Sequence, residues 1–282
     1  MKVPAEEREH EIEITGDGMK KIGSALFSAV AMVVALVGCD GLSSEPTYSG
    51  LSLEAFNYTS YNLSRFVITD KYGNQASGGG DLMPGSGAGR LSCCYQLQGT
   101  EFSVEWKMYD ADVASKDLYK PIQYISFKEN IHLPPTKLEG NAGTRILGLH
   151  FYPDAHVEPE FRSDLGVSRI SYRTVHRTLL QQYGKKIDPA GKLNEAELFR
   201  RTARIASEAW KKYRLTDSED LVQFVKFYLL VNPDFDRFPQ VQEILKDTQG
   251  KPGDFGREMN RLPEAVVNQI KTFSVSGKEQ YP

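Results

Sequence analysis

One stretch near the N-terminus restricts the fold of the whole chain, because it is too apolar to belong to a soluble surface. It runs from Met19 to Cys39 and reads MKKIGSALFSAVAMVVALVGC. Lys20 and Lys21 stand at its start, and the residues up to Val37 are apolar or small. A basic start, a short apolar segment and small residues before a cleavage point form the pattern of an export signal. The sequence therefore predicts a signal peptide over residues 19–38, which takes no part in the folded core.

Cys39 stands directly at the predicted cleavage point, after the residues Leu36-Val37-Gly38. This box resembles a bacterial lipoprotein signal. The resemblance implies cleavage after Gly38 and lipidation of Cys39 by a diacylglycerol group, which anchors the chain in the cell envelope with its bulk facing the periplasm. A buried helix or an ordinary membrane span is the weaker alternative, because the run is shorter than the roughly 20 residues that cross a bilayer.

The segments on either side of the signal are expected to lie outside the fold. Residues 1–18 are rich in glutamate, which is the wrong charge in front of a signal. The simplest interpretation is a misannotated leader with translation starting at Met19, and the alternative is a short cytoplasmic tail. Residues 39–50 contain Ser, Gly, Glu and Pro and are interpreted as a tether. Asp40 resembles the signal that retains enteric lipoproteins in the inner membrane, so the inner membrane is favoured over the outer.

Composition limits what the rest of the chain can be. The full sequence has 40% hydrophobic and 25% charged residues, which is typical of a globular protein. The formal net charge of -3 argues against nucleic acid as a partner, because nucleic-acid binding normally requires a basic surface.

Residues 51–172 show the pattern of short strands separated by turns. Apolar and polar residues alternate in segments such as Leu51–Thr59 and Glu101–Met108, as in half-buried strands. Further strands are expected at 65–69, 93–95, 122–127 and 144–152. This half is therefore predicted to form an antiparallel β-sandwich or a small barrel.

From residue 173 to residue 275 the pattern changes to helix, with a short tail at 276–282. Apolar residues between Leu193 and Tyr213 recur every three or four positions, which indicates an amphipathic helix. A capping box is expected at Thr216, before a second helix that Asn232-Pro233 ends. A short helix at 241–246 and a final one at 256–272, interrupted at Pro263, complete an all-α domain. The fold class is thus predicted as α+β.

Cys93 and Cys94 are neighbours, and the sequence allows two interpretations of their bonding state. In a strand, consecutive side chains point to opposite faces, so a disulfide between them requires a bent backbone. One interpretation is such a vicinal disulfide, with a structural or a redox role. The other places one thiol in the core and the other beneath the glycine-rich segment 77–89. A zinc site is not favoured, because structural zinc needs four ligands.

Two other segments could be interpreted as chemical sites, but a structural interpretation as a loop or a turn is favoured for each. Segment 77–89 lacks the ending of a phosphate-binding loop, so a surface loop that adapts to a partner is favoured. His150, Asp154 and His156 form the tightest cluster with metal or acid–base potential. Pro153-Asp154-Ala155 is typical of a hairpin turn, which places the histidines beside a turn rather than on a metal. Glu158 and Glu160 are then expected on the exposed face of the second strand.

Several strings between Phe56 and Val157 resemble a family of proteobacterial lipoproteins that is known only as a domain of unknown function. They are Phe56-Asn-Tyr-Thr, the glycine-rich segment with Cys93-Cys94, Val104-Glu-Trp, and the string LHFYPDAHV at 149–157. Members of the family often lie beside genes for type VI secretion effectors, including lipase-like ones. The resemblance therefore implies an immunity protein that binds an incoming toxin, and it implies no catalytic residues.

Two functions from different classes follow. The favoured one is a tethered lipoprotein that neutralises a secreted lipase-like toxin, with that protein and the membrane as its partners. The alternative is an envelope structural or housekeeping lipoprotein without a toxin partner. An enzyme is the third choice, because no nucleophile–base pair or cofactor loop stands out. No cofactor, metal or small-molecule substrate is expected.

Overall fold

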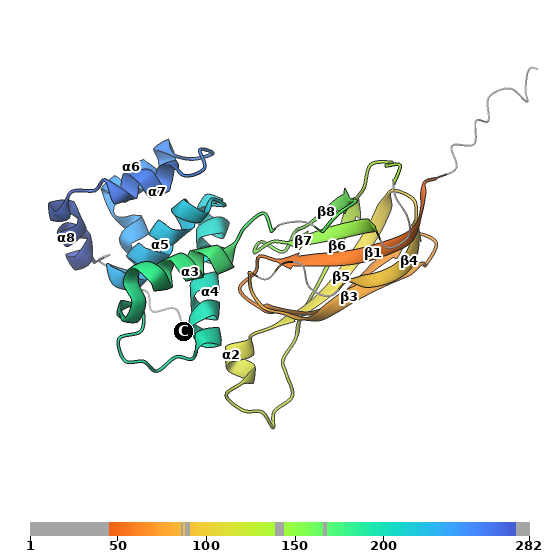
Figure 1. Ribbon diagram of the computed structural model, residues 1–282, viewed down its shortest axis with the longest axis horizontal. Coiled ribbons are helices and arrows are strands. Elements are labelled where there is room, and N and C mark those ends of the chain that lie inside the picture. The colour runs from red at the N-terminus through yellow and green to blue at the C-terminus, as the bar shows by residue number, and fades with distance from the viewer. Residues whose placement is uncertain (1–44, 86, 88–90, 139–143, 166–167, 275–282) are drawn as a thin grey trace, which may run out of the picture. The chain divides into compact units, whose positions relative to one another are not determined.

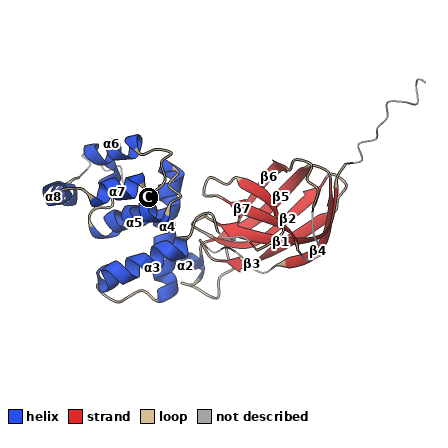
Figure 2. Cartoon of the chain, turned by 45° about the horizontal axis from the view of Figure 1, so that its top comes forward, coloured by secondary structure: helices blue, strands red, loops and turns tan. Residues whose placement is uncertain are grey.

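The computed structural model describes residues 45–85, 87, 91–138, 144–165 and 168–274. Within them, the first part of the chain consists of two four-stranded sheets and the second part consists of helices (Figure 1). Figure 2 shows the same division by colour, with red strands followed by blue helices. The predicted α+β fold with a β-sandwich followed by a helical region is confirmed. The signal segment and Cys39 lie outside the described residues.

The two sheets have different topologies. One has the strand order β4-β1-β7-β8 and the other β3-β2-β5-β6. Their strands are β1 (Thr47–Asn57), β2 (Asn62–Asp70), β3 (Gln75–Leu82), β4 (Ser92–Gln98), β5 (Glu101–Tyr109), β6 (Ile125–His132), β7 (Arg145–Phe151) and β8 (Val157–Arg162). The second sheet is antiparallel throughout. The first is mixed, because β1 and β7 run parallel, and the expectation of a purely antiparallel sandwich is wrong at this pair.

Alternation along the central strands explains how the sandwich is filled. Leu51, Leu53 and Ala55 of β1 belong to the core between the sheets, and the residues between them face the other way. The same core contains Leu149 of β7 and Trp106 of β5. The outward-facing residues of β1 are nevertheless buried, so this sheet is covered on both sides.

Strand β3 corrects the prediction of a glycine-rich surface loop. Residues 75–82 pair with β2 in register, with Gly78 opposite Phe66. A Cβ at Gly78 would lie 2.4 Å from the Phe66 ring, so any side chain there would require the ring to move. Gly79 has a φ of 132° beside a register shift in β2. The glycines therefore allow close packing against an aromatic ring and a β-bulge. Strand β6 also lies later than the predicted 122–127.

The helical region follows the last strand after a short connection. Its helices are α3 (Tyr172–Tyr183), α4 (Glu195–Tyr213), α5 (Ser218–Leu230), α6 (Pro239–Asp247), α7 (Asp254–Asn260) and α8 (Glu264–Thr272). A one-turn helix, α2 (Ala111–Ala114), lies earlier, between β5 and β6. The break between α7 and α8 contains Pro263, as the sequence predicts.

Side-chain caps begin helices α4 and α5. At α4, Asn194 accepts a hydrogen bond from the Glu197 N–H, and Glu197 accepts one from the Asn194 N–H. This is a capping box, and the sequence analysis had not placed one here. At α5 the cap is Asp217, which accepts from the N–H groups of Glu219 and Asp220. The predicted cap at Thr216 is therefore wrong by one residue.

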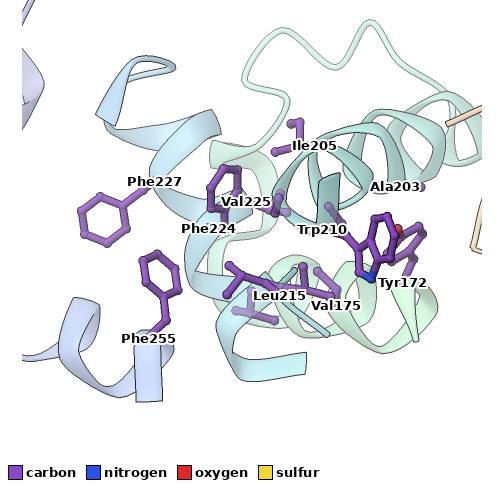
Figure 3. Close-up of a cluster of buried hydrophobic side chains, with 14 of the residues drawn as sticks. Tyr172, Val175, Ala203, Ile205, Trp210, Leu215, Phe224, Val225, Phe227 and Phe255 are labelled. Carbon is purple, nitrogen blue, oxygen red and sulfur yellow. The ribbon is translucent and has the colours of Figure 1, made fainter. Parts of the chain in front are cut away.

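The helices share a core rich in aromatic rings. Figure 3 shows Phe224 and Phe227 of α5 with Phe255 of α7, all buried. The Phe224 and Phe235 rings lie 4.9 Å apart, and Phe235 is buried. Phe56 and Tyr58 belong to this core as well, and the Tyr172 hydroxyl donates to the Tyr58 carbonyl at 2.8 Å. Residues 45–282 consequently form one compact unit.

Candidate functional site

The cysteine pair of β4 is the first predicted site that the structure places. A disulfide joins Cys93 and Cys94. Both residues are exposed, so the interpretation that one thiol lies in the core is wrong. Cys93 pairs with Ser52 of β1. The pair therefore lies at the outer edge of the first sheet.

The predicted turn at Pro153–Ala155 is confirmed as the connection of the β7–β8 hairpin. Asp154 Oδ1 is hydrogen-bonded to the His156 ring and Asp154 Oδ2 accepts from Arg214 at 2.9 Å. The His156 ring stacks on Tyr152 with 4.4 Å between ring centroids. In the described part of the chain, no three His, Cys, Asp or Glu residues are grouped as metal ligands.

His150 is separated from this turn and buried on the outer face of the first sheet. Its Nδ1 lies 3.0 Å from the Tyr58 hydroxyl, and its Nε2 lies 3.0 Å from Glu160. Burial, followed by the Arg169 guanidinium, lowers the pKa of His150, although Glu160 acts in the opposite direction. Burial raises the pKa of Tyr58 to about 12. The pair therefore resembles a buried structural network more than an acid–base site that a substrate can reach.

Two ion pairs extend that network along the same face. Arg162 pairs with the fully buried Glu54, and Arg169 pairs with Glu158. The Arg162 guanidinium packs over Gly148, where a Cβ would lie 3.4 Å from it, an ordinary van der Waals contact. Glu158 is exposed, as expected, and Glu160 is partly exposed, with side-chain exposures of 48% and 38%; both also form ion pairs with Arg169. We interpret this face as a support for the chain, not as its binding site.

The feature that best fits a binding site lies elsewhere, in residues 113–125, which run from the end of α2 to the first residue of β6 and which we call the apolar loop. Six of its large apolar side chains are exposed. Leu118 is 83% exposed and Tyr119 is 100% exposed. The other four are Val113, Ile122, Tyr124 and Ile125. Single exposed apolar residues are ordinary, but a group of them on one segment marks an interaction site.

The base of the apolar loop is held in place by ion pairs to helix α4. Arg204 contacts both Asp110 and Asp112, at 2.8 Å and 2.5 Å. Arg200 contacts Asp112 at 2.6 Å. Asp110 also caps α2 by accepting from the Asp112 N–H at 2.8 Å. We call these four residues the clamp. A loop held at its base loses less conformational entropy when a partner binds.

The apolar loop projects from one end of the sandwich. The opposite end carries the start of β1, where the Gly99 N–H donates to the Pro46 carbonyl at 2.8 Å. Strand β5 connects the two ends through its nine residues, a distance of about 30 Å at the rise of an extended strand. Strand β1 therefore begins at one end of the sandwich, and the connection between β5 and β6 lies at the other (Figure 1).

The sequence analysis did not single out this loop. The available signal was the string DLYKPIQYI at 117–125, where apolar residues occur without the alternation of a half-buried strand. Comparison of the chain with protein families, with curated proteins and with solved structures finds no match. The lipoprotein family resemblance stays a prediction. None of the helices in the described residues has the length and apolar character that a membrane crossing requires.

Proposed function

We propose that this chain is a periplasm-facing lipoprotein, anchored through Cys39, that binds and neutralises a secreted antibacterial effector of the lipase-like type VI class. The observation that carries the binding role is the apolar loop, whose tip residues Leu118 and Tyr119 stand almost fully in solvent. Apolar and aromatic side chains at the centre of an interface supply most of its binding energy. An immunity protein needs such a surface and needs no catalytic group.

A protein with a concave surface is the partner that suits the apolar loop. Aromatic anchors bind best in well-packed pockets that exclude water, and a projecting loop fits an enzyme cleft better than a flat face. A lipid surface is less suitable. Segment 110–125 contains three aspartates and two lysines, so anionic headgroups do not attract it. The loop also lies at the end of the sandwich opposite to Pro46.

Anchoring supports the same role by confinement. An inhibitor held at the membrane meets an effector that attacks the membrane at a raised effective concentration. The alternative function, an envelope structural or housekeeping lipoprotein, gives no reason for a clamped and exposed apolar loop.

The test is a growth-rescue assay with the effector encoded beside this chain's gene, expressed in the periplasm. We expect the wild-type chain to restore growth and Leu118→Asp to lose that protection. Leu165→Asp is the matched control, because Leu165 is also exposed and lies outside the loop. It should protect like the wild type. Failure of the wild type to protect would contradict the immunity role and favour the housekeeping alternative. Full protection by Leu118→Asp would contradict the role of the loop.

A further inference from the structure

A second site lies in a groove of about 730 Å³ between the end of β3 and helices α3 and α4. Its size is within the range of small-molecule pockets. Apolar side chains supply part of its wall, including Leu82, Leu180 and Phe199. The groove does not involve the apolar loop, and its ligand is independent of the proposed function.

His176 lines this groove and has an unsatisfied ring nitrogen. The residue is 7% exposed, and its Nε2 has no hydrogen-bond partner among the described residues. Its Nδ1 lies 3.1 Å from the Thr202 hydroxyl. That hydroxyl donates to the Leu198 carbonyl at 3.1 Å, so its oxygen accepts from the ring. The proton of a neutral His176 is therefore on Nδ1, and Nε2 is left as a buried acceptor.

An unpaired buried acceptor destabilises a protein. Burial lowers the pKa of His176, while the Glu195 carboxylate acts to raise it. The ring therefore favours its neutral form and leaves Nε2 without a proton of its own. A ligand that brings a proton to Nε2 satisfies this atom, and an acid is the simplest ligand that does so.

The charged groups around His176 favour an anion. Arg173 and Arg177 lie on α3 at the groove, and neither forms an ion pair with another described residue. Two acids also line the groove. Asp81 already accepts from Tyr109 at 2.6 Å and from Asn62 at 3.1 Å. Glu195 is the first residue of α4, where the positive end of the helix dipole partly balances its charge.

We propose that this groove binds a single-chain amphiphile with a carboxyl head. The head lies between His176 Nε2 and the Arg177 guanidinium, and the hydrocarbon chain follows Leu82, Leu180 and Phe199. The carboxyl group and the His176 ring share one proton, so an acid that binds through this hydrogen bond carries its proton in with it. Arginine then contributes the charge-assisted contact to the carboxylate.

Phe199 lies beside the His176 ring at the groove. Its ring stands edge-on to the His176 ring, with 5.4 Å between centroids and an interplanar angle of 83°. Nε2 is covered from solvent, so binding at this atom requires a rearrangement of side chains at the groove, and partly buried side chains such as Phe199 make rotamer changes readily.

The test is photoaffinity labelling of the full chain in maltoside micelles. The probe is dodecanoic acid with a diazirine at the end of its chain, and the matched probe is the corresponding alcohol. Peptide mass spectrometry locates the labels. We expect the acid to label the peptides that contain Leu82, Leu180 and Phe199, and an excess of plain dodecanoic acid to remove the label. The alcohol should label them about tenfold less, because it lacks the charge-assisted contact.

Two variants and a pH series separate this site from general adsorption. Arg177→Gln and His176→Phe should each reduce labelling several-fold. Arg201→Gln, which removes an exposed arginine of α4, should leave it unchanged. Labelling should also be stronger at about pH 6 than at about pH 8, because the shared proton is then more available. Equal labelling by acid and alcohol, labels spread over the whole chain, or equal results for Arg177→Gln and Arg201→Gln would each overturn the proposal.

Discussion

The clamp at the base of the apolar loop makes a prediction that can be worked out from the structure. The Asp112 carboxylate forms ion pairs with Arg200 at 2.6 Å and with Arg204 at 2.5 Å. The Asp112 side chain is 26% exposed. Hydrogen bonds to charged groups contribute about 1.5–3 kcal/mol when buried, whereas exposed ion pairs contribute about 0.2–1 kcal/mol. For this partly exposed group we expect Asp112→Ala to lower the free energy of unfolding by about 1–2 kcal/mol.

Two measurements check the clamp. Thermal unfolding should show a Tm lower by about 2–4 °C per kcal/mol for a unit of this size. A double-mutant cycle with Arg204→Ala should give a coupling free energy of about 1 kcal/mol. Amide hydrogen exchange should increase across residues 113–124 and stay unchanged in β5, because the loop opens locally when its base is released.

A matched control is available in the second sheet. Lys128 and Glu105 form an ion pair at 2.7 Å, with side chains 63% and 60% exposed. Lys128→Ala should change the free energy of unfolding by less than about 0.5 kcal/mol. A coupling free energy below about 0.3 kcal/mol for Asp112 and Arg204, with unchanged exchange in the loop, would refute the clamp.

Three further predictions concern the buried ion pair of Glu54, the hydrogen-bonded Asp70 at the end of β2 and the lipid anchor at Cys39. Glu54→Gln should lower the free energy of unfolding in urea by about 3–5 kcal/mol, because it leaves the largely buried Arg162 charge unpaired. A decrease below about 1 kcal/mol would contradict the claim that Glu54 and Arg162 form a buried ion pair. Burial acts to raise the pKa of Asp70, but hydrogen bonds from Asn74, Gln98 and Tyr72 lower it overall. Asp70 therefore stabilises the fold above its unfolded pKa of about 3.9 and loses this contribution as the pH falls further. In Asp70→Asn, the free energy of unfolding should depend less steeply on pH below about pH 4. The same pH dependence as in the wild type would show that Asp70 does not contribute to it. Cys39→Ala should weaken protection in cells more than binding to the purified effector, and equal loss in both assays would contradict the tether's role.

The general architecture follows from the sequence because its signals are local. Strict alternation in Glu101–Met108 identifies β5, and Asn232-Pro233 marks the end of α5. The parallel pairing of β1 and β7 does not follow, because it joins residues far apart in the chain and depends on packing of the whole sheet. Strand β3 is missed because its glycines are poor strand formers by propensity. Their role appears only when Phe66 is placed opposite Gly78.

The candidate site was harder to predict than the fold. His150, Asp154 and His156 are close in the sequence, but the hairpin buries His150 beside Tyr58 and leaves His156 at the turn. The apolar loop has no motif, and only the exposed fractions of Leu118 and Tyr119 distinguish it from a core strand. His176 likewise draws attention only after Thr202 fixes its tautomer.

Hydrogen–deuterium exchange of the full chain with and without the neighbouring effector tests the central claim most directly. If the apolar loop is the binding surface, protection should be concentrated in residues 113–125 and in the clamp helix α4, with little change in β4 or in α6 to α8. Protection confined to those other elements, or no protection at effector concentrations that saturate binding, would contradict it.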